Sequence, residues 1–203
     1  MNVLVVVAHP LPASLTQVVA GEIANAARTA GHTAEVADLA AEGFSAVFAA
    51  ADRSAQQGEA PRPHDVVAEQ ARLDRADHLV LVYPVYWWSM PALLKGWIER
   101  VFVSGWAFDE GEDGAIVKKL GRLKVHLVAL GGASARTYAR HGYADAMKVQ
   151  IEHGIFDFCG APVISSCLIV PDQAGGATDP QHIASAIIDH IDGDVNEACD
   201  PIR

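Results

Sequence analysis

The sequence predicts an α/β fold in which a doubly wound parallel sheet of five strands carries helices on both faces. Five runs rich in Val, Leu and Ile alternate with longer stretches whose apolar residues have helical spacing. This order is typical of parallel strands joined by crossover helices. With 203 residues, of which 51% are hydrophobic, the chain can bury one sizeable core. We therefore expect a single domain spanning residues 1–203.

The expected strands differ in how apolar they are. They cover residues 2–8, 32–39, 77–83, 124–130 and 163–170. Three of them are almost continuously apolar, as expected for central strands that are buried on both faces. The run at 32–39 alternates between apolar and polar residues instead, which favours an edge strand.

The expected helices follow from apolar residues that recur every three to four positions. In the first helix these are Leu15, Val18, Val19, Ile23, Ala26 and Ala27, and the helix ends before Gly31. Further helices are expected near residues 65–76, 91–103, 138–153 and 180–191.

Two stretches, 40–63 and 105–121, lack a clear period and are expected to be long loops. Long loops in a compact domain often cover a site or build an interface. Neither stretch has the composition of an interdomain linker.

Composition and charge argue against several classes of partner. The formal net charge of −10 opposes binding to nucleic acid or to anionic lipid. No apolar run is long enough to cross a membrane, so we expect a soluble protein without membrane insertion. The three cysteines form no CxxC pair and suggest neither a disulfide framework nor a zinc site, which fits a reducing cytoplasm.

Metal chemistry and hydrolysis also lack a signature. The nine histidines include no HExxH pair, and no GxSxG elbow is present. The acidic run from Asp109 to Asp113 lacks the ligand spacing of a calcium loop and is expected to be solvated. His182 and His190 are expected on the solvent face of the last helix. No metal is predicted.

A ligand is expected beyond the carboxyl ends of the strands, where the winding direction of such a sheet reverses. The loop after the first strand runs from His9 into the first helix at Leu15 and Thr16. Ser14 can cap this helix, whose free amides and dipole suit a phosphate. The loop contains no glycine, which argues against a GxGxxG fingerprint and a P-loop. An ordinary N-cap serine and an ordinary loop histidine remain the alternative.

The loop after the third strand carries three consecutive aromatic residues, Tyr86, Trp87 and Trp88, between Pro84 and Pro91. Aromatic rings offer a flat apolar surface, which suits a planar π-rich ligand such as a flavin ring. The alternative is that the rings fill the core. We prefer that alternative for Trp97 and Phe102, but three adjacent rings in one turn cannot all face inward.

The loop after the fourth strand contains Gly131 and Gly132. Glycines allow backbone amides to approach a ligand closely, here the electron-rich edge of a flavin. An ordinary turn after a strand is the alternative.

Taken together, these motifs resemble the flavodoxin-like NAD(P)H:quinone oxidoreductases, a family that includes quinone reductases, modulators of drug activity and ancillary subunits of potassium efflux systems. The resemblance covers most of the chain and depends above all on the block from Pro84 to Phe102. Its other motifs are Ala8-His9-Pro10 with Ser14, Asp38-Leu39, Glu42-Gly43-Phe44, Asp52-Arg53, Gly105-Trp106-Ala107-Phe108 and Gly131-Gly132.

The resemblance implies a flavodoxin-like fold and a homodimer with FAD or FMN near its interface. It also implies an oxidoreductase that takes hydride from NAD(P)H and passes it to a quinone-like substrate after the nicotinamide has left. By position, the residues expected at the flavin phosphate are His9, Ser14, Leu15 and Thr16. Those expected around the flavin ring are Pro84, Val85, Tyr86, Trp87, Trp88, Ala129, Leu130, Gly131 and Gly132.

Tyr138 and His141 are similar to the Tyr and His that line the family's hydride-accepting pocket, and they are the expected catalytic residues. They could donate to an oxyanion that develops on flavin or quinone. The spacing from Gly132 to Tyr138 is longer than usual, so either Tyr138 or Tyr143 could fill the aromatic role. Leu15-Thr16 and Ala129-Leu130 also depart from the frequent Phe-Asn and Thr-Thr.

Two other functions remain open. The protein could be a one-electron carrier like flavodoxin, or a flavin-binding regulatory subunit of a membrane transporter. The sequence does not distinguish FMN from FAD, or NADH from NADPH.

Overall fold

The computed structural model describes residues 1–171 and 179–193. The strands in these ranges are β1 (Asn2–Val7), β2 (Thr33–Asp38), β3 (His78–Pro84), β4 (Phe108–Glu110), β5 (Ile116–Lys118), β6 (Lys124–Leu130) and β7 (Val163–Ile169). The helices are α1 (Leu15–Thr29), α2 (Ala50–Gln56), α3 (His64–Arg75), α4 (Ala92–Val101), α5 (Ala135–His141), α6 (Tyr143–Met147), the π-helix η1 (Lys148–Asp157) and α7 (Pro180–Asp192).

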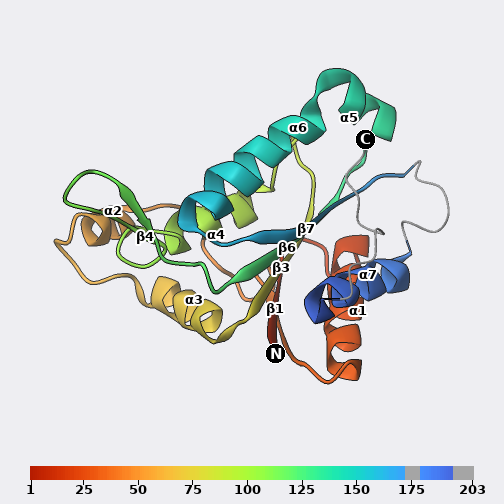
Figure 1. Cartoon of the computed structure of the whole chain (residues 1–203), viewed down its shortest axis with the longest axis horizontal. Coiled ribbons are helices and arrows are strands. Elements are labelled where there is room, and N and C mark those ends of the chain that lie inside the picture. Colours follow the sequence, from red (N-terminus) through yellow and green to blue (C-terminus); the bar gives the residue numbers. More distant parts are fainter. Residues whose placement is uncertain (172–178, 194–203) are drawn as a thin grey trace.

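Five strands form one parallel sheet in the order β2-β1-β3-β6-β7. From β1 the chain first adds β2 on one side and then β3, β6 and β7 on the other, so the winding reverses between β1 and β3. Figure 1 shows α1 and α7 on one face of the sheet and α3, α4 and α6 on the other. The predicted fold class and strand set are confirmed, and β2 is an edge strand as expected.

The apolar runs are explained by burial on both faces. In β1, Val3 and Val5 pack toward α1 and α7, whereas Leu4 and Val6 pack toward the opposite core, and all four are at most 2% exposed. Successive strand side chains point to opposite faces, so a strand covered on both sides needs apolar residues at every position.

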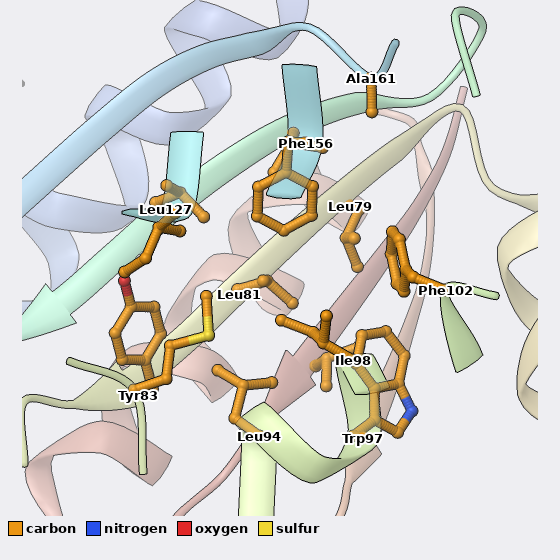
Figure 2. Close-up of a cluster of buried hydrophobic side chains, with 14 of the residues drawn as sticks. Leu79, Leu81, Tyr83, Leu94, Trp97, Ile98, Phe102, Leu127, Phe156 and Ala161 are labelled. Carbon is orange, nitrogen blue, oxygen red and sulfur yellow. The ribbon is translucent and has the colours of Figure 1, made fainter. Parts of the chain in front are cut away.

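The core on the α4 face is rich in aromatic side chains, several of which are labelled in Figure 2. Phe102 packs edge-to-face on both Trp97 and Phe156. The Trp97 indole is fully buried, and its Nε1 donates to Glu69 Oε2 at 2.9 Å. Trp97 and Phe102 are therefore core residues, as predicted.

The two stretches expected to be loops each contain regular structure. Helix α2 lies within 40–63, and Asp52 holds its start by accepting from the Ala49 amide at 2.8 Å. Asp52 also pairs with the buried Arg100 at 2.9 Å, so a tertiary contact fixes a helix that has little periodicity of its own. Strands β4 and β5 form an antiparallel pair within 105–121.

The helix expected at 138–153 is interrupted. Gly142 adopts a left-handed conformation, with φ of 67°, where α5 ends and α6 begins. Glycine adopts this conformation without steric penalty and therefore often ends helices. Beyond α6 the chain continues as η1, and wide helices of this kind are rare outside functional sites.

Two expectations about helix faces are wrong in part. Leu15 and Val18 are 47% and 46% exposed, while Thr16 is buried beside Val19 and Ile23 on the inward face of α1. His182 is exposed as predicted, but the Nε2 atom of His190 is buried and has no hydrogen-bond partner within the described residues.

Candidate functional site

The loops that follow β1, β3 and β6 leave the sheet at one edge. These strands are direct neighbours, and backbone hydrogen bonds continue past their ends, from the Val85 amide to Leu130 O at 2.8 Å and from the Gly131 amide to Ile169 O at 2.7 Å. We call this edge the carboxyl rim, meaning residues 8–16, 84–91 and 129–134 together with 138–143. It includes the switch point between β1 and β3, where open α/β sheets bind ligands.

The first loop leads into a helix start with free backbone amides. Ser14 is the N-cap of α1, and its Oγ accepts from the Gln17 amide at 3.3 Å. The Leu15 and Thr16 amides have no hydrogen-bond partner in the described part of the chain. Free amides at the positive end of a helix dipole favour phosphate. His9 lies beside this turn, where its Nδ1 accepts from the Leu11 amide at 3.1 Å.

Gln17 also helps to fix the start of α1, although the sequence pattern does not mark it as a site residue. Its Nε2 donates to Asp38 Oδ2 at 2.8 Å, which ties the start of α1 to the end of β2. The other Asp38 oxygen accepts from the amides of Ala40 and Ala41, each at 3.1 Å. A glutamine in the first turn of a helix is usually solvated, so its position gave no signal.

The second loop is a strained two-residue turn. Tyr86 and Ser89 exchange backbone hydrogen bonds of 3.0 and 3.1 Å, and Trp87 and Trp88 between them have φ of 49° and 61°. Positive φ in a bulky residue costs roughly 1 to 2 kcal/mol, and such strain is concentrated at functional sites. The turn leaves Trp87 93% exposed, whereas Trp88 is half-buried.

The two glycines of the third loop have different surroundings. A Cβ added to Gly131 would lie 2.6 Å from the Tyr138 hydroxyl, so the native packing requires glycine there. A Cβ added to Gly132 would meet nothing within 4 Å among the described residues. Protein packing therefore explains Gly131, while Gly132 borders open space at the rim.

An aromatic cluster stands beside these glycines. The Tyr143 ring stacks on Trp88 with centroids 3.8 Å apart and planes at 13°, and His141 stacks on Tyr143 at 5.2 Å. Tyr138 meets Trp88 edge-on at 5.5 Å. Tyr138 is only 1% exposed, and burial raises the pKa of its hydroxyl, which stays protonated at neutral pH. The structure therefore places Tyr138 beneath the rim and Tyr143 within the stack.

The rim can thus accept an anion at α1, a flat ring near the tryptophan turn and a polar ring edge at Gly132. A nucleotide-type cofactor with a planar ring has these three parts, and the open space at Gly132 is where a ring edge fits. Within the described ranges no group of three or more His, Cys, Asp or Glu side chains could hold a metal ion. None of the helices described is both long and apolar enough to span a membrane.

A doubly wound sheet with an anion-binding helix start and an aromatic turn at its switch point defines a cofactor-binding α/β protein. The chain belongs to the flavodoxin-like fold family, whose model matches residues 1–191.

Two solved structures similar to this chain are those of a quinone oxidoreductase and of a putative quinone reductase. The chain is similar to an NAD(P)H:quinone oxidoreductase from Methanothermobacter marburgensis, at 26% identity and a TM-score of 0.79, over 91% of this chain and 93% of that one. A putative quinone reductase from Klebsiella pneumoniae is 27% identical with a TM-score of 0.79, over 95% of this chain and 84% of that one.

NAD(P)H dehydrogenase (quinone) 1 of Rattus norvegicus is 37% identical over 111 residues, which are 52% of this chain and 39% of that protein. This match and that to the Pongo abelii ribosyldihydronicotinamide dehydrogenase (quinone) span only 39% and 45% of those proteins.

Proposed function

We propose that this protein is a flavin-dependent NAD(P)H oxidoreductase that reduces quinones or related electrophilic acceptors. The observation that carries the proposal is the carboxyl rim, where free helix amides, a strained tryptophan turn and an open glycine lie on neighbouring strands. The likeness to two NAD(P)H:quinone oxidoreductase-type structures over more than nine tenths of the chain supports it.

Phosphate binding is assigned to the start of α1. The amides of Leu15 and Thr16 would donate to phosphate oxygens, Ser14 would order the turn, and His9 would flank it. Because the helix start is fixed by capping and by the Gln17–Asp38 hydrogen bond, little reordering is needed on binding.

Ring binding is assigned to the other two loops. When bound, the flavin supplies a ring that takes up hydride and passes it on. The chain's own task is to hold flat rings in parallel contact and to exclude water. The residues proposed to surround the ring are Pro84, Val85, Tyr86, Trp87, Trp88, Ala129, Leu130, Gly131 and Gly132.

His141 and Tyr143 are proposed to face the reacting rings, and Tyr138 to position the rim. His141 is exposed and stacks on Tyr143, so its imidazole can reach a bound acceptor and donate a proton to it. The Tyr138 hydroxyl instead lies against Gly131, and it would act on the ring through that glycine.

Assembly and location are part of the same proposal. The chain is treated as one flavodoxin-like domain over residues 1–203, and we propose that it forms a homodimer in which the partner covers the rim. The exposure of Trp87 supports an interface at the rim, and Val47 (69%) and Phe48 (38%) are further exposed apolar side chains that a partner could cover. A nicotinamide donor dissolved in the cytoplasm would supply the electrons, so we place the protein in that compartment.

The test begins with cofactor binding. Purified protein is titrated with FMN and with FAD and followed by flavin fluorescence and visible absorbance. The reconstituted protein is then assayed for oxidation of NADH and NADPH with a benzoquinone as acceptor. We expect one flavin per chain and parallel double-reciprocal plots, because donor and acceptor use one site in turn. Failure to bind either flavin would refute the proposal. Flavin binding without turnover would favour the electron carrier or the regulatory subunit.

A further inference from the structure

A separate cavity lies beside the sheet, below α6 and η1. Its volume is about 120 Å³, and it reaches from β3 and β6 to the edge strand β7. Its apolar walls are formed by Leu127, Ala129, Ala144, Met147, Ile151 and Leu168. Among residues of the carboxyl rim, only Ala129 takes part. The cavity therefore shares only Ala129 with the proposed flavin site.

One nearly buried tyrosine presents its hydroxyl to this cavity. Tyr83 is 1% exposed, lines the cavity, and its hydroxyl makes no hydrogen bond within the described residues. Figure 2 shows its ring in the core beside Leu127. The hydroxyl oxygen is not sealed off from solvent, so it is available to a ligand that enters the cavity.

A carboxylate faces the same space. Glu152 of η1 lines the cavity, is half-buried, and has no ion pair or hydrogen bond in the described ranges. Burial raises the pKa of Tyr83, and the negative charge of Glu152 raises it further, so the tyrosine stays protonated. The other polar side chains of the lining are Asp145, Lys148 and Ser166. Tyr83 and Glu152 differ from these because one is a nearly buried hydroxyl that can donate and the other a half-buried carboxylate that can accept.

The element that supplies Glu152 is itself unusual. It is the ten-residue π-helix η1, which also brings Lys148 and Ile151 to the cavity. In such a wide helix, the backbone hydrogen bonds reach one residue further than in an α-helix, and such segments are frequently found at functional sites.

We propose that this cavity binds a neutral single-ring phenol, whose hydroxyl accepts from Tyr83 and donates to Glu152. A closed cavity of about 150 Å³ in another protein holds benzene, so a six-membered ring fits the scale of this space, which opens to solvent. The apolar walls suit the ring, and a hydroxyl is a single group that can pair with both the Tyr83 hydroxyl and the Glu152 carboxylate. The proposal does not rest on flavin binding.

The test uses the full chain and phenol itself as the probe, with toluene as the matched ligand that lacks a hydroxyl. Binding is followed through the Met147 methyl signal in NMR titrations. We expect phenol to bind at least tenfold more tightly than toluene, and Tyr83→Phe to weaken phenol roughly tenfold while leaving toluene unchanged. Glu152→Gln, at a half-exposed position that tolerates substitution, should weaken phenol similarly.

Two controls separate this site from the rim. Tyr86→Phe makes the same chemical change outside the cavity and should leave phenol binding unchanged, and saturating FMN should not displace phenol. Equal affinity for phenol and toluene, equal phenol affinity in all variants, or displacement of phenol by FMN would overturn the proposal. A protein that fails to bind flavin but binds phenol as described would refute only the proposed function.

Discussion

The two ends of the central sheet contain unusual residues that are held in opposite ways. At the carboxyl rim, Trp87 is exposed on a strained turn and Gly132 borders open space. At the amino-terminal end, His78 of β3 and His126 of β6 are 1% and 0% exposed and stack on each other. Their Nδ1 and Nε2 atoms lie 2.9 Å apart, and His126 Nδ1 lies 2.8 Å from Ser165 Oγ.

The difference teaches that unusual residue types alone do not mark a site in a parallel sheet. Three of the four ring nitrogens of the histidine pair have a hydrogen-bond partner within the described residues, and both rings are buried, so the pair belongs to the core. At the rim, Trp87 is turned outward and Gly132 borders open space, beyond the strand ends where ligands bind in such sheets. Exposure and strain, rather than residue type, separate the ligand-binding end from the structural end.

The largest expected effect is a loss of stability at low pH, caused by the histidine pair at the amino-terminal end of the sheet. Burial lowers the pKa of His78 to about 4, helped by Lys124, and burial together with His78 lowers that of His126 to about 3. Unfolded histidine has a pKa of about 6.5, so the unfolded chain takes up protons first as the pH falls. The stability that the histidine pair contributes is therefore fully present above pH 6.5. It is lost as the pH falls toward 4, and the free energy of unfolding drops by at least about 3 kcal/mol.

Urea denaturation between pH 7 and pH 4 checks this expectation. The charged or titratable groups around the pair also include Asp77, His32, His190 and the amino terminus. The comparison is with a His78→Leu/His126→Leu variant, which keeps those other groups. The wild type should lose more stability than the variant over this interval. Equal losses in the two proteins would show that other groups cause the acid sensitivity.

The next effect sharpens the contrast within the rim. Gly132→Val should weaken flavin binding about 100-fold, which is roughly 2.7 kcal/mol, without lowering the melting temperature, because a Cβ at this position meets no atom of the described residues. Gly131→Val is the matched control. Its Cβ would crowd the Tyr138 hydroxyl, so the free energy of unfolding should fall by roughly 1 to 3 kcal/mol. Fluorescence titration measures the flavin affinity of both variants, and thermal denaturation measures their stability. A Gly132→Val protein with wild-type flavin affinity would show that the flavin ring does not bind at this rim.

Most of the fold could be predicted because burial on both faces leaves a strong mark in sequence. Strands β1, β3 and β6 are nearly continuous apolar runs, and α1 and α7 have one apolar face. Helix α2 escaped prediction because it is held by Asp52, which pairs with a residue 48 positions away. Such contacts between distant residues have no local pattern.

The candidate site could be predicted in its location but not in its details. Strand order follows from the alternation of elements, so the three loops were expected at one edge. The depth of Tyr138 and the stacking of Tyr143 on Trp88 depend on the break at Gly142, whose left-handed φ turns the chain between them. A helical period read across residues 138–153 cannot reveal a break of this kind.

The smallest effect tests the strain itself, and it has opposite signs for stability and binding. Asparagine tolerates positive φ in two-residue turns far better than tryptophan does. Trp87 loses no burial on replacement, since 93% of it is exposed, so Trp87→Asn should raise the free energy of unfolding by about 1 kcal/mol. The same change should weaken flavin binding roughly tenfold by removing a flat surface. Trp88→Asn should instead lower stability, because the Trp88 ring stacks on Tyr143. Chemical denaturation and flavin titration of both variants measure these effects. A Trp87→Asn protein that is less stable than the wild type would show that the backbone of the turn is not strained at Trp87.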